Sequence, residues 1–481
     1  MSKVDLSGTP LHFIGIGGIG MSALAQITAR RGLPVSGSDV RGSHITKRLE
    51  SLGALIFLVQ EAANIDKVIA RQAANSLVSV SATGSTSDSN ALPQVVCSTA
   101  IAPSNPEYQA AVSMGCPIFH RSDLLAALID RYLSIAVSGT HGKTTTSSMI
   151  GYMLLAANVD PTIIVGGEVE AWGGNARTGS GAYLVAEADE SDGSLVKHSP
   201  SIGIITNIEL DHPDRYSSLD EVVDIFQTFA GNCETVVGCW DDPVVRERIE
   251  LDISYSLDPD SGADYIATEV SYHAAGSSAQ IRERGELLGT LKLQLLGKHN
   301  LSNALSAVAI GRKIGLDFDT IVKALNQFAG TKRRFEVKGE VKGTKFVDDY
   351  AHHPNEIAVT LAAAKLKVTE GIHPRVVAVF QPHRYSRTET FMKEFAACFS
   401  DADVVIITDI YGAGEANINQ ISGKDLATEA AKHHPRVRYH QDLGSLPKFL
   451  TSEILQSEDL VLFLGAGNLN QYIEETIKLA R

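Results

Sequence analysis

Seven residues, Gly139 to Thr145 (GTHGKTT), follow directly after the apolar run SIAVS and lead into a run of small and apolar residues. A glycine-rich turn between a strand and a helix is the arrangement in which backbone amides hold phosphate groups. Lys143 can then reach the β and γ oxygens, and the Thr144 hydroxyl can bind Mg²⁺. Val137 stands where the strict motif has its first glycine. The sequence nevertheless predicts an ATP site formed by Gly139, Thr140, His141, Gly142, Lys143, Thr144 and Thr145.

Apolar runs alternate with helical patterns along the rest of the chain, which predicts parallel α/β sheets. Near the N-terminus the expected strands cover residues 11–16, 34–38, 54–57 and 94–98, and further strands cover 375–381, 404–409 and 459–465. A length of 481 residues fits about three domains. We expect three α/β domains over residues 1–124, 125–330 and 331–481. The small, polar segment 82–93 is predicted to be a surface loop.

Composition restricts the partners and the compartment. The net charge of −14 argues against binding to nucleic acid, because neutralising phosphates requires a surplus of Lys and Arg. The five cysteines are scattered without metal-ligand spacing, so neither a zinc site nor a disulfide framework is predicted. No apolar run approaches the roughly 20 residues that cross a bilayer, and the N-terminus lacks a signal pattern. We expect a cytoplasmic protein without membrane contact.

A second glycine loop, GIGGIG, lies between the first predicted strand and the following helix. Asp39 follows this loop by about twenty residues, where an acid binds ribose in dinucleotide folds. Three interpretations remain open for the loop: an NAD site, a cradle for the pyrophosphate of another nucleotide such as a UDP-sugar, or a structural turn. Its glycines are Gly15, Gly17, Gly18 and Gly20.

Acids and a histidine follow two central strands. Glu187 could supply the carboxylate that a nucleotide-bound Mg²⁺ requires, and His212 could bind a second divalent ion. The alternative is that the segment EADESD is a solvated acidic loop. Further along, Asn300 and Asn303 share a helix face and could hydrogen-bond an adenine, or Asn300 could be only an N-cap.

Basic and aromatic side chains gather in the C-terminal third. Arg334 suits developing phosphoryl charge, and Asp349 could orient a metal-bound water or a basic side chain. Arg384 and Arg387, with His383, follow an apolar strand and could clamp carboxylates or phosphates. The alternative is that these are ordinary surface residues.

Taken together, these segments resemble the Mur ligase family from about Leu11 to Gly467. The matching segments, in chain order, are HFIGIGGIGMSALA, SGTHGKTTT, AEADESDGS, NIELDH, LLGKHNLSNALSA, GTKRRFE, VDDYAHHP, QPHRYSRT and FLGAGN. The resemblance implies a Rossmann-like N-terminal domain that binds a UDP-sugar, a central ATPase domain and a Rossmann-like C-terminal domain. It also implies ATP-dependent attachment of L-alanine to the lactyl carboxylate of UDP-N-acetylmuramate through an acyl phosphate, in peptidoglycan precursor synthesis.

The resemblance implies a role for each matching residue. Thr144, Glu187 and His212 would bind Mg²⁺, with Mn²⁺ as an alternative, and Arg334 and Asp349 would reach toward the phosphates. Asn300 and Asn303 would contact the adenine nucleotide. The residues around the muramoyl carboxylate and the alanine would be Tyr350, His352, His383, Arg384 and Arg387. The residues that hold the UDP-sugar would be Gly15, Gly17, Gly18, Gly20, Asp39, Ser98 and Thr99.

One departure from the pattern of the wider family indicates which branch of the family the sequence resembles. Ligases that add later amino acids typically carry a carbamoylated lysine shortly after the position of His212, and no lysine lies between Lys197 and Lys292. This favours the alanine-adding branch. We expect the protein to be a monomer or a weak homodimer. The alternatives are a ligase that recycles a whole tripeptide onto the same sugar nucleotide, an NAD-dependent dehydrogenase, and a non-catalytic nucleotide-binding regulator.

Overall fold

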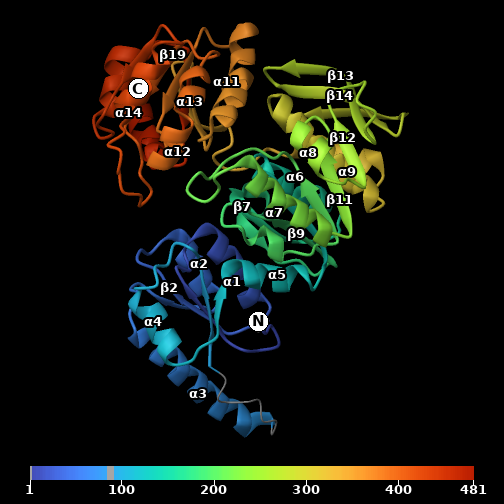
Figure 1. Ribbon diagram of the computed structural model, residues 1–481, viewed down its shortest axis with the longest axis vertical. Helices are drawn as coiled ribbons and strands as arrows, with labels where there is room; N and C mark the ends of the chain where they lie inside the picture. The colour runs from blue at the N-terminus through green and yellow to red at the C-terminus, as the bar shows by residue number, and fades with distance from the viewer. Residues whose placement is uncertain (1–2, 84–91) are drawn as a thin grey trace. The chain divides into compact units, whose positions relative to one another are not determined.

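The computed structural model describes residues 3–83 and 92–481. The chain forms two compact units, and each unit contains several separate stretches of sequence. The first unit comprises Met1–Ser138, Asn158–Ile204 and Ile225–Val236, and the second comprises Gly139–Ala157, Ile205–Asp224 and Val237–Arg481. Figure 1 carries the element labels used below. This division does not decide the predicted domain boundaries at residues 124 and 330, which stay predictions.

The first unit begins with a parallel five-stranded sheet in the order β3-β2-β1-β4-β5. Its strands are β1 (Leu11–Ile14), β2 (Val35–Ser38), β3 (Leu55–Phe57), β4 (Gln94–Cys97) and β5 (Ile118–His120). The accompanying helices are α1 (Ile19–Arg30), α2 (His44–Ser51), α3 (Ala63–Thr83), α4 (Pro106–Ser113) and α5 (Arg121–Ile129). The order and the alternation are those of a Rossmann-like fold, as predicted.

Successive side chains of the central strand β1 point to opposite faces of this sheet, and each face has its own core. Leu11 and Phe13 pack in a cluster with residues of α1 and α5. Ile14 packs in another cluster with residues of α3 and α4. Helices therefore cover both faces, which explains why the strand is apolar at nearly every position.

The first unit also contains strands in the order β10-β6-β9-β7-β8. β6 pairs with β9 and β9 with β7 in parallel, whereas β7 and β8 are antiparallel. The bounds are β6 (Leu133–Ser138), β7 (Thr162–Val169), β8 (Gly174–Arg177), β9 (Tyr183–Glu187) and β10 (Ile202–Ile205). The strand β6 is the apolar run that precedes the phosphate loop in the sequence.

The second unit contains strands in the order β15-β14-β13-β12-β11, of which the last three listed pair in parallel and the first three are antiparallel. The bounds are β11 (Thr235–Cys239), β12 (Ile253–Ser256), β13 (Tyr265–His273), β14 (Gly276–Glu283) and β15 (Glu286–Leu293). The helices of this region are α6 (Lys143–Ala156), α7 (Leu219–Asn232, shared with the first unit), α8 (Pro243–Arg248), α9 (Lys298–Lys313) and α10 (Phe318–Gln327).

A six-stranded sheet in the order β16-β17-β21-β18-β19-β20 completes the second unit. All its pairs are parallel except β16 with β17. Its strands are β16 (Glu336–Val341), β17 (Thr344–Asp349), β18 (Val376–Phe380), β19 (Val404–Ile407), β20 (Val437–Tyr439) and β21 (Leu460–Leu464). Its helices are α11 (Pro354–Thr369), α12 (Tyr385–Thr390), α13 (Met392–Ala397), α14 (Gly423–Ala430), α15 (Leu446–Phe449) and α16 (Ile473–Ala480).

Strand β18 shows how this sheet is covered. Ala378 and Phe380 pack in a core cluster with residues of α11, α13 and α14, which are labelled near β19 in Figure 1. Val377 and Val379 point the other way and pack with residues of α15 and α16. Both faces are therefore buried, and the polar residues that follow β17 and β18 lie at the carboxyl ends of parallel strands, where open α/β sheets place their sites.

The expectation of a loop over residues 82–93 was wrong at its start, because α3 continues to Thr83; residues 84–91 lie outside the described part of the chain.

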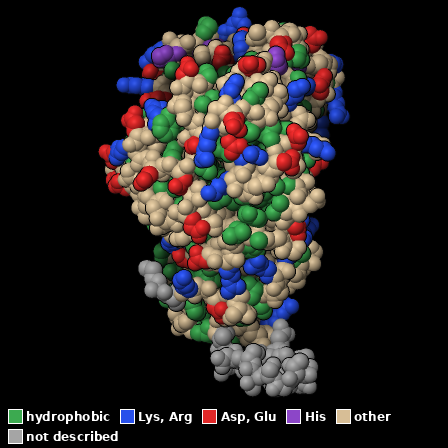
Figure 2. Space-filling view, turned by 90° about the vertical axis from the view of Figure 1, so that its right-hand side faces the viewer, with side chains coloured by type: hydrophobic (Ala, Val, Ile, Leu, Met, Phe, Trp, Pro, Cys, Tyr) green, Lys and Arg blue, Asp and Glu red, His purple; other side chains and the backbone are tan. Residues whose placement is uncertain are grey.

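Figure 2 shows Lys and Arg side chains interspersed with Asp and Glu over the face in view, so the net charge of −14 is not gathered into one patch there. In the described ranges, every helix is too short or too polar to span a bilayer.

Candidate active site

The phosphate loop joins β6 to α6 and needs glycine at two positions. Gly139 has φ of +135° and Gly142 has φ of +83°. A Cβ atom at Gly139 would overlap the Thr206 hydroxyl, and one at Gly142 would lie 2.8 Å from Oδ1 of Asn303. Any larger residue would collide with Thr206 or Asn303. The structure therefore forms a tight glycine turn at the N-terminus of α6, a phosphate cradle of the kind whose backbone amides bind phosphate groups.

The side chain of Lys143 folds back over this loop. Its Nζ donates to the carbonyl oxygens of Gly139 and Thr140 at 2.6 and 3.0 Å. Thr144 and Thr145 follow in the first turn of α6, and both are buried. A lysine held over the loop places its positive charge at the N-terminus of the helix, where an anion is also favoured by the backbone N–H groups.

The segment after β10 fixes the shape of the loop. Asn207 accepts the N–H of His141 through Oδ1 at 2.8 Å, and its carbonyl accepts the N–H of Thr140 at 3.0 Å. The Thr206 hydroxyl donates to the carbonyl of His141 at 2.6 Å. Sequence reasoning did not single out Asn207. Its signals were its position directly after a buried strand, where chemistry-bearing residues gather, and its place at the start of the matching segment NIELDH.

Asn300 and Asn303 lie in the first turns of α9, whose N-cap is Gly297. The alternative that Asn300 caps the helix was wrong, because the helix begins before it; its side chain donates to the carbonyl of Leu296 at 2.8 Å. Asn303 is buried and lies against Gly142 of the phosphate loop. The structure thus brings Asn303 to the nucleotide cradle.

The two candidate metal-binding side chains other than Thr144 lie in different units. Glu187 ends β9 in the first unit and accepts the N–H of Gly166 at 2.7 Å. His212 lies in the second unit with φ of +57°, and its N–H donates to Oδ1 of Asp211 at 2.7 Å. A carboxylate oxygen such as those of Glu187 is a ligand type that Mg²⁺ and Mn²⁺ favour.

Asp211 receives the guanidinium of Arg387 in a buried ion pair. Nε of Arg387 lies 3.0 Å from Oδ1 of Asp211, and the two side chains are 3% and 5% exposed. Burial acts to raise the pKa of Asp211, but Arg387 and His212 outweigh it and hold that pKa well below its usual range. Arg387 also lies 3.5 Å from a ring nitrogen of His212 and of His383. The pair therefore fixes these two histidines.

Arg384 begins the turn before α12 with φ of +70°. Its Nη1 lies 2.7 Å from Oδ2 of Asp214 and 3.4 Å from Oε1 of Glu415. Burial lowers the pKa of the neighbouring His383 to about 3, so this imidazole is neutral at pH 7. Both side chains sit at the carboxyl end of β18, as the sequence predicted.

Tyr350, His352 and Arg334 lie together at the carboxyl end of β17. The Arg334 guanidinium carbon lies 5.4 Å from the centre of the Tyr350 ring, and the Tyr350 and His352 rings are 5.3 Å apart in an edge-on arrangement. Asp349 accepts the N–H groups of Phe335 at 2.7 Å and of Ala351 at 2.8 Å. Its carboxylate therefore supports the backbone around Arg334 and Tyr350. Burial raises the pKa of Asp349 to about 6.

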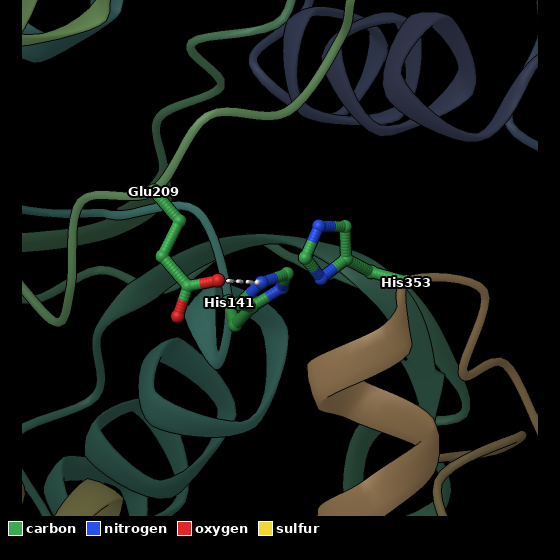
Figure 3. Close-up of side chains that lie close together, drawn as sticks. All are labelled: His141, Glu209 and His353. Carbon is green, nitrogen blue, oxygen red and sulfur yellow. Dashed lines mark ion pairs between the residues drawn. The ribbon is translucent and has the colours of Figure 1, made fainter. Parts of the chain in front are cut away.

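His141 of the phosphate loop lies among side chains that the sequence did not connect to it. Its Nε2 lies 3.5 Å from Oε2 of Glu209, and its Nδ1 lies 3.3 Å from Oε1 of Glu356. The ring of His353 is 4.7 Å away, and Figure 3 shows it facing His141. Burial acts to lower the pKa of His141, but the carboxylates of Glu209 and Glu356 outweigh it and raise the pKa to about 10.

The ligand atoms of His141, Glu209 and His353 lie within 4.8 Å of one another, which makes them a candidate cation site. Zinc with nitrogen or oxygen ligands at about 2.1 Å needs donors about 3.4 Å apart in a tetrahedron. Because Glu356 also lies 3.3 Å from Nδ1 of His141, the imidazole lies between two carboxylates, an arrangement that favours its protonated form.

In the first unit, the other glycine loop closes on Asp39. The N–H of Gly17 donates to Oδ2 of Asp39 at 2.9 Å, and a Cβ at Gly17 would lie 2.8 Å from the same oxygen. Gly15 has φ of +81°, and Gly18 caps α1. A Cβ at Gly20 would lie 3.5 Å from Nη1 of Arg121. Glycine is thus required at Gly17 to let Asp39 reach the loop.

Arg121 is a further residue that sequence reasoning did not identify. Its Nη2 lies 3.0 Å from carboxylate oxygens of both Asp189 and Asp192. These acids belong to the segment EADESD, so at least part of that segment is paired rather than solvated. Ser98 and Thr99 follow β4, and the Ser98 carbonyl accepts the N–H of Ile101 at 3.1 Å.

Comparison with known families matches three models along the chain. They are described as the Mur ligase family catalytic domain (residues 10–133), the Mur ligase middle domain (residues 137–311) and the Mur ligase glutamate ligase domain (residues 333–467).

Two relatives illustrate the similarity in sequence. The UDP-N-acetylmuramate–L-alanine ligase of Nostoc punctiforme is 60% identical over 476 residues, which cover 99% of this chain and 97% of the relative. The protein of the same name from Microcystis aeruginosa is 58% identical over 481 residues, which cover 100% of this chain and 98% of the relative.

Two solved structures illustrate the similarity in fold. The UDP-N-acetylmuramate–alanine ligase of Thermotoga maritima is 29% identical with a TM-score of 0.79, and the match covers 98% of each chain. A murein peptide ligase of Psychrobacter arcticus is 21% identical with a TM-score of 0.68, over 98% of this chain and 99% of that one, and at this identity it shows the shared fold alone.

Proposed function

Because this chain belongs to the Mur ligase family, we infer that it uses ATP to join L-alanine to the lactyl carboxylate of UDP-N-acetylmuramate, a step of peptidoglycan synthesis. The observation that carries this proposal is the 60% identity to a ligase of that name over 99% of the chain. The cradle at Gly139 and Gly142, with Lys143 folded over it, supports ATP as the energy source. Cell-wall assembly, and with it cell shape and division, would depend on this product.

The reaction needs ATP because a carboxylate is a poor electrophile. In the first step, an oxygen of the lactyl carboxylate attacks the γ-phosphorus, and ADP leaves with the electrons of the broken P–O bond. The resulting acyl phosphate has a good leaving group. In the second step the neutral α-amine of L-alanine attacks the acyl carbon, and the tetrahedral intermediate expels inorganic phosphate. The amine loses one proton as the amide forms.

The protein would contribute position and charge. Backbone amides of the loop and Lys143 would hold the β- and γ-phosphates, and Arg334 would neutralise charge on the transferred group. Tyr350, His352, His383 and Arg384 would surround the carboxylate and the alanine, and the loop from Gly15 to Gly20 with Asp39, Ser98 and Thr99 would hold the UDP-sugar. Asn300 and Asn303 would contact the adenine nucleotide. Arg387 would help to surround the carboxylate and the alanine, held in place by its ion pair with Asp211. Holding reactants in such geometry supplies most of the rate gain in transfers of this kind.

A divalent ion belongs to this proposal as well. Thr144, Glu187 and His212 would hold Mg²⁺ or Mn²⁺, which when bound neutralises charge on the phosphates. We further propose a cytoplasmic protein that acts as a monomer or weak homodimer.

The other candidate functions have less support. An NAD-dependent dehydrogenase has no use for a phosphate loop, and ligase models match all three regions of the chain. The tripeptide-recycling ligase is supported by similarity of fold alone. A non-catalytic regulator would bind nucleotide without releasing phosphate.

Phosphate release by the purified protein tests the proposal. We expect release that requires ATP, UDP-N-acetylmuramate and L-alanine together, and a Lys143→Ala variant slower by about 10²- to 10³-fold. Replacing L-alanine in turn with glycine, L-serine and L-alanyl-γ-D-glutamyl-meso-diaminopimelate measures the choice of acceptor. Release supported by the tripeptide but not by L-alanine would overturn the proposal in favour of the recycling ligase.

A further inference from the structure

Glu356 caps the helix α11 with one of its two carboxylate oxygens. Oε2 accepts the backbone N–H groups of His352 at 2.9 Å and of His353 at 3.3 Å. His353 is the N-cap, and its side chain accepts the N–H of Asn355 in return. This is a capping box, a common way to satisfy the free N–H groups of a helix start. The cap explains one oxygen of Glu356 and leaves the other to be explained.

The second oxygen, Oε1, faces the phosphate loop. It lies 3.3 Å from Nδ1 of His141 and 3.8 Å from Nη1 of Arg334. Oε2 in addition lies 3.1 Å from Nδ1 of His352. One carboxylate therefore contacts the ATP cradle, the arginine expected at the phosphates and a histidine expected at the alanine. Its side chain is 12% exposed, so water screens these charges weakly.

The imidazole of His141 is held from its other side too. Glu209 lies 3.5 Å from Nε2 of His141, and Asn355 on α11 donates to Glu209 at 2.5 Å. The backbone of His141 is tied to Asn207 and Thr206. The N-terminal end of α11 therefore contacts the phosphate loop and its neighbour Glu209 through charged and polar side chains, besides the ring contact of His353 with His141. Contacts between charged groups are stronger than those between neutral groups, so they favour one position of the helix start relative to the loop.

We propose that Glu356 is a positioning residue of the ligase reaction, which fixes the phosphate loop, through His141, relative to His352 and Arg334. This inference rests on the proposed function. Its chemical basis is that a phosphoryl donor and an acceptor carboxylate must be closely aligned, and Glu356 contacts His141 of the phosphate loop as well as His352 and Arg334. The negative charge matters because all three partners carry nitrogen donors.

The alternative is that Glu356 serves only to cap α11, and four variants distinguish the two. Glu356→Gln keeps the size and removes the charge. Glu356→Asp keeps a carboxylate able to cap the helix but is one methylene too short for His141. His141→Gln removes the partner, and the double variant Glu356→Gln/His141→Gln completes a thermodynamic cycle. Asp425→Asn is the matched control, because Asp425 is exposed and fills the same position in the capping box of α14 with Ser422.

The measurements are kcat and KM for ATP and for L-alanine, together with the midpoint of thermal unfolding. We expect Glu356→Gln and Glu356→Asp each to lower kcat/KM by about 10²-fold. The kcat/KM of the double variant should be at most about threefold lower than that of the less active single variant, because both substitutions break the same contact between Glu356 and His141. Asp425→Asn should lower the unfolding midpoint less than Glu356→Gln, because Asp425 is exposed, and should leave kcat/KM unchanged.

Either of two results would overturn the inference. One is that the effects of Glu356→Gln and His141→Gln multiply in the double variant. The other is that Glu356→Asp is fully active, which would show that the contact with His141 is unnecessary. If Glu356→Gln does not fold, Glu356→Asp, His141→Gln and their combination form the cycle instead. Wild-type protein without alanine-dependent phosphate release would refute the proposed function itself, so the two failures are separable.

Discussion

Arg387 and Asp211 form an ion pair with both side chains almost completely buried, with Nε of the arginine 3.0 Å from Oδ1 of the aspartate. The aspartate follows the segment that shapes the phosphate loop, and the arginine lies on α12 of the C-terminal sheet. An arginine predicted from its motif to bind substrate is therefore also a structural link. Removing one partner of a buried ion pair lowers the stability of the folded protein strongly, because the other partner is left as an uncompensated buried charge.

Replacing Asp211 with alanine should lower the free energy of unfolding by about 3 to 5 kcal/mol, because Arg387 is left as an unpaired buried charge. Urea unfolding at pH 7 measures this difference. The control is Glu429→Ala, which removes an exposed pair with Lys432 and should cost no more than about 1 kcal/mol. Equal losses in the two variants would show that the burial of the Arg387 pair contributes nothing to its strength.

Replacing Gly142 with alanine should reduce ligase activity by about 10²-fold, because the new Cβ lies in the phosphate cradle 2.8 Å from Asn303. The left-handed φ of +83° adds about 1 to 2 kcal/mol of strain. Gly262→Ala is a matched control, since Gly262 has φ of +73° and nothing within 4 Å of the added Cβ. The Gly262→Ala variant should show a similar loss in the free energy of unfolding and keep the kcat of the wild type. A comparable loss of activity in both variants would argue against the cradle.

The stabilising effect of His141 should depend on pH in a defined window. Its pKa is raised from 6.5 to about 10 in the folded protein, so the folded state holds the proton more tightly than the unfolded state. The contribution is fully present below pH 6.5 and is lost as the pH rises toward 10. The groups that face the ring are Glu209, Glu356 and His353.

Chemical unfolding of wild type and of His141→Gln at pH 6, 8 and 10 tests this expectation. The stability difference between the two proteins should be largest at pH 6 and should shrink steadily to pH 10. Subtracting the two curves removes the titration of the other groups, which both proteins share. A difference that grows with pH would mean that His141 is neutral in the folded state.

The Thr144 hydroxyl should set the requirement for a divalent ion. Thr144→Ala should raise the Mg²⁺ concentration for half-maximal activity by about 10- to 100-fold, whereas Thr144→Ser, which keeps the hydroxyl, should stay near the wild-type value. Activity titrated with Mg²⁺ and with Mn²⁺ after treatment with a chelator measures both. An identical metal dependence of the alanine and serine variants would exclude a direct ligand role for Thr144.

Much of the fold followed from local patterns in the sequence. The apolar runs VVAVF and LVLFL are fully buried strands, because parallel strands covered on both faces cannot alternate polar and apolar residues. The antiparallel strands β13, β14 and β15 were not predicted. They are partly exposed, and their mixed composition gives a weaker signal than a buried run.

The sequence by itself determined the phosphate loop, since a strand, a glycine turn and a helix start are specified by adjacent residues and need no distant partner. It could not reveal the role of Glu356. The pattern His353-Pro-Asn-Glu356 is a capping box whose N-cap histidine is not among the residues that usually mark a helix start. Only the tertiary structure brings Glu356 to His141, and only burial makes that contact strong, because the same two charges in water would be screened.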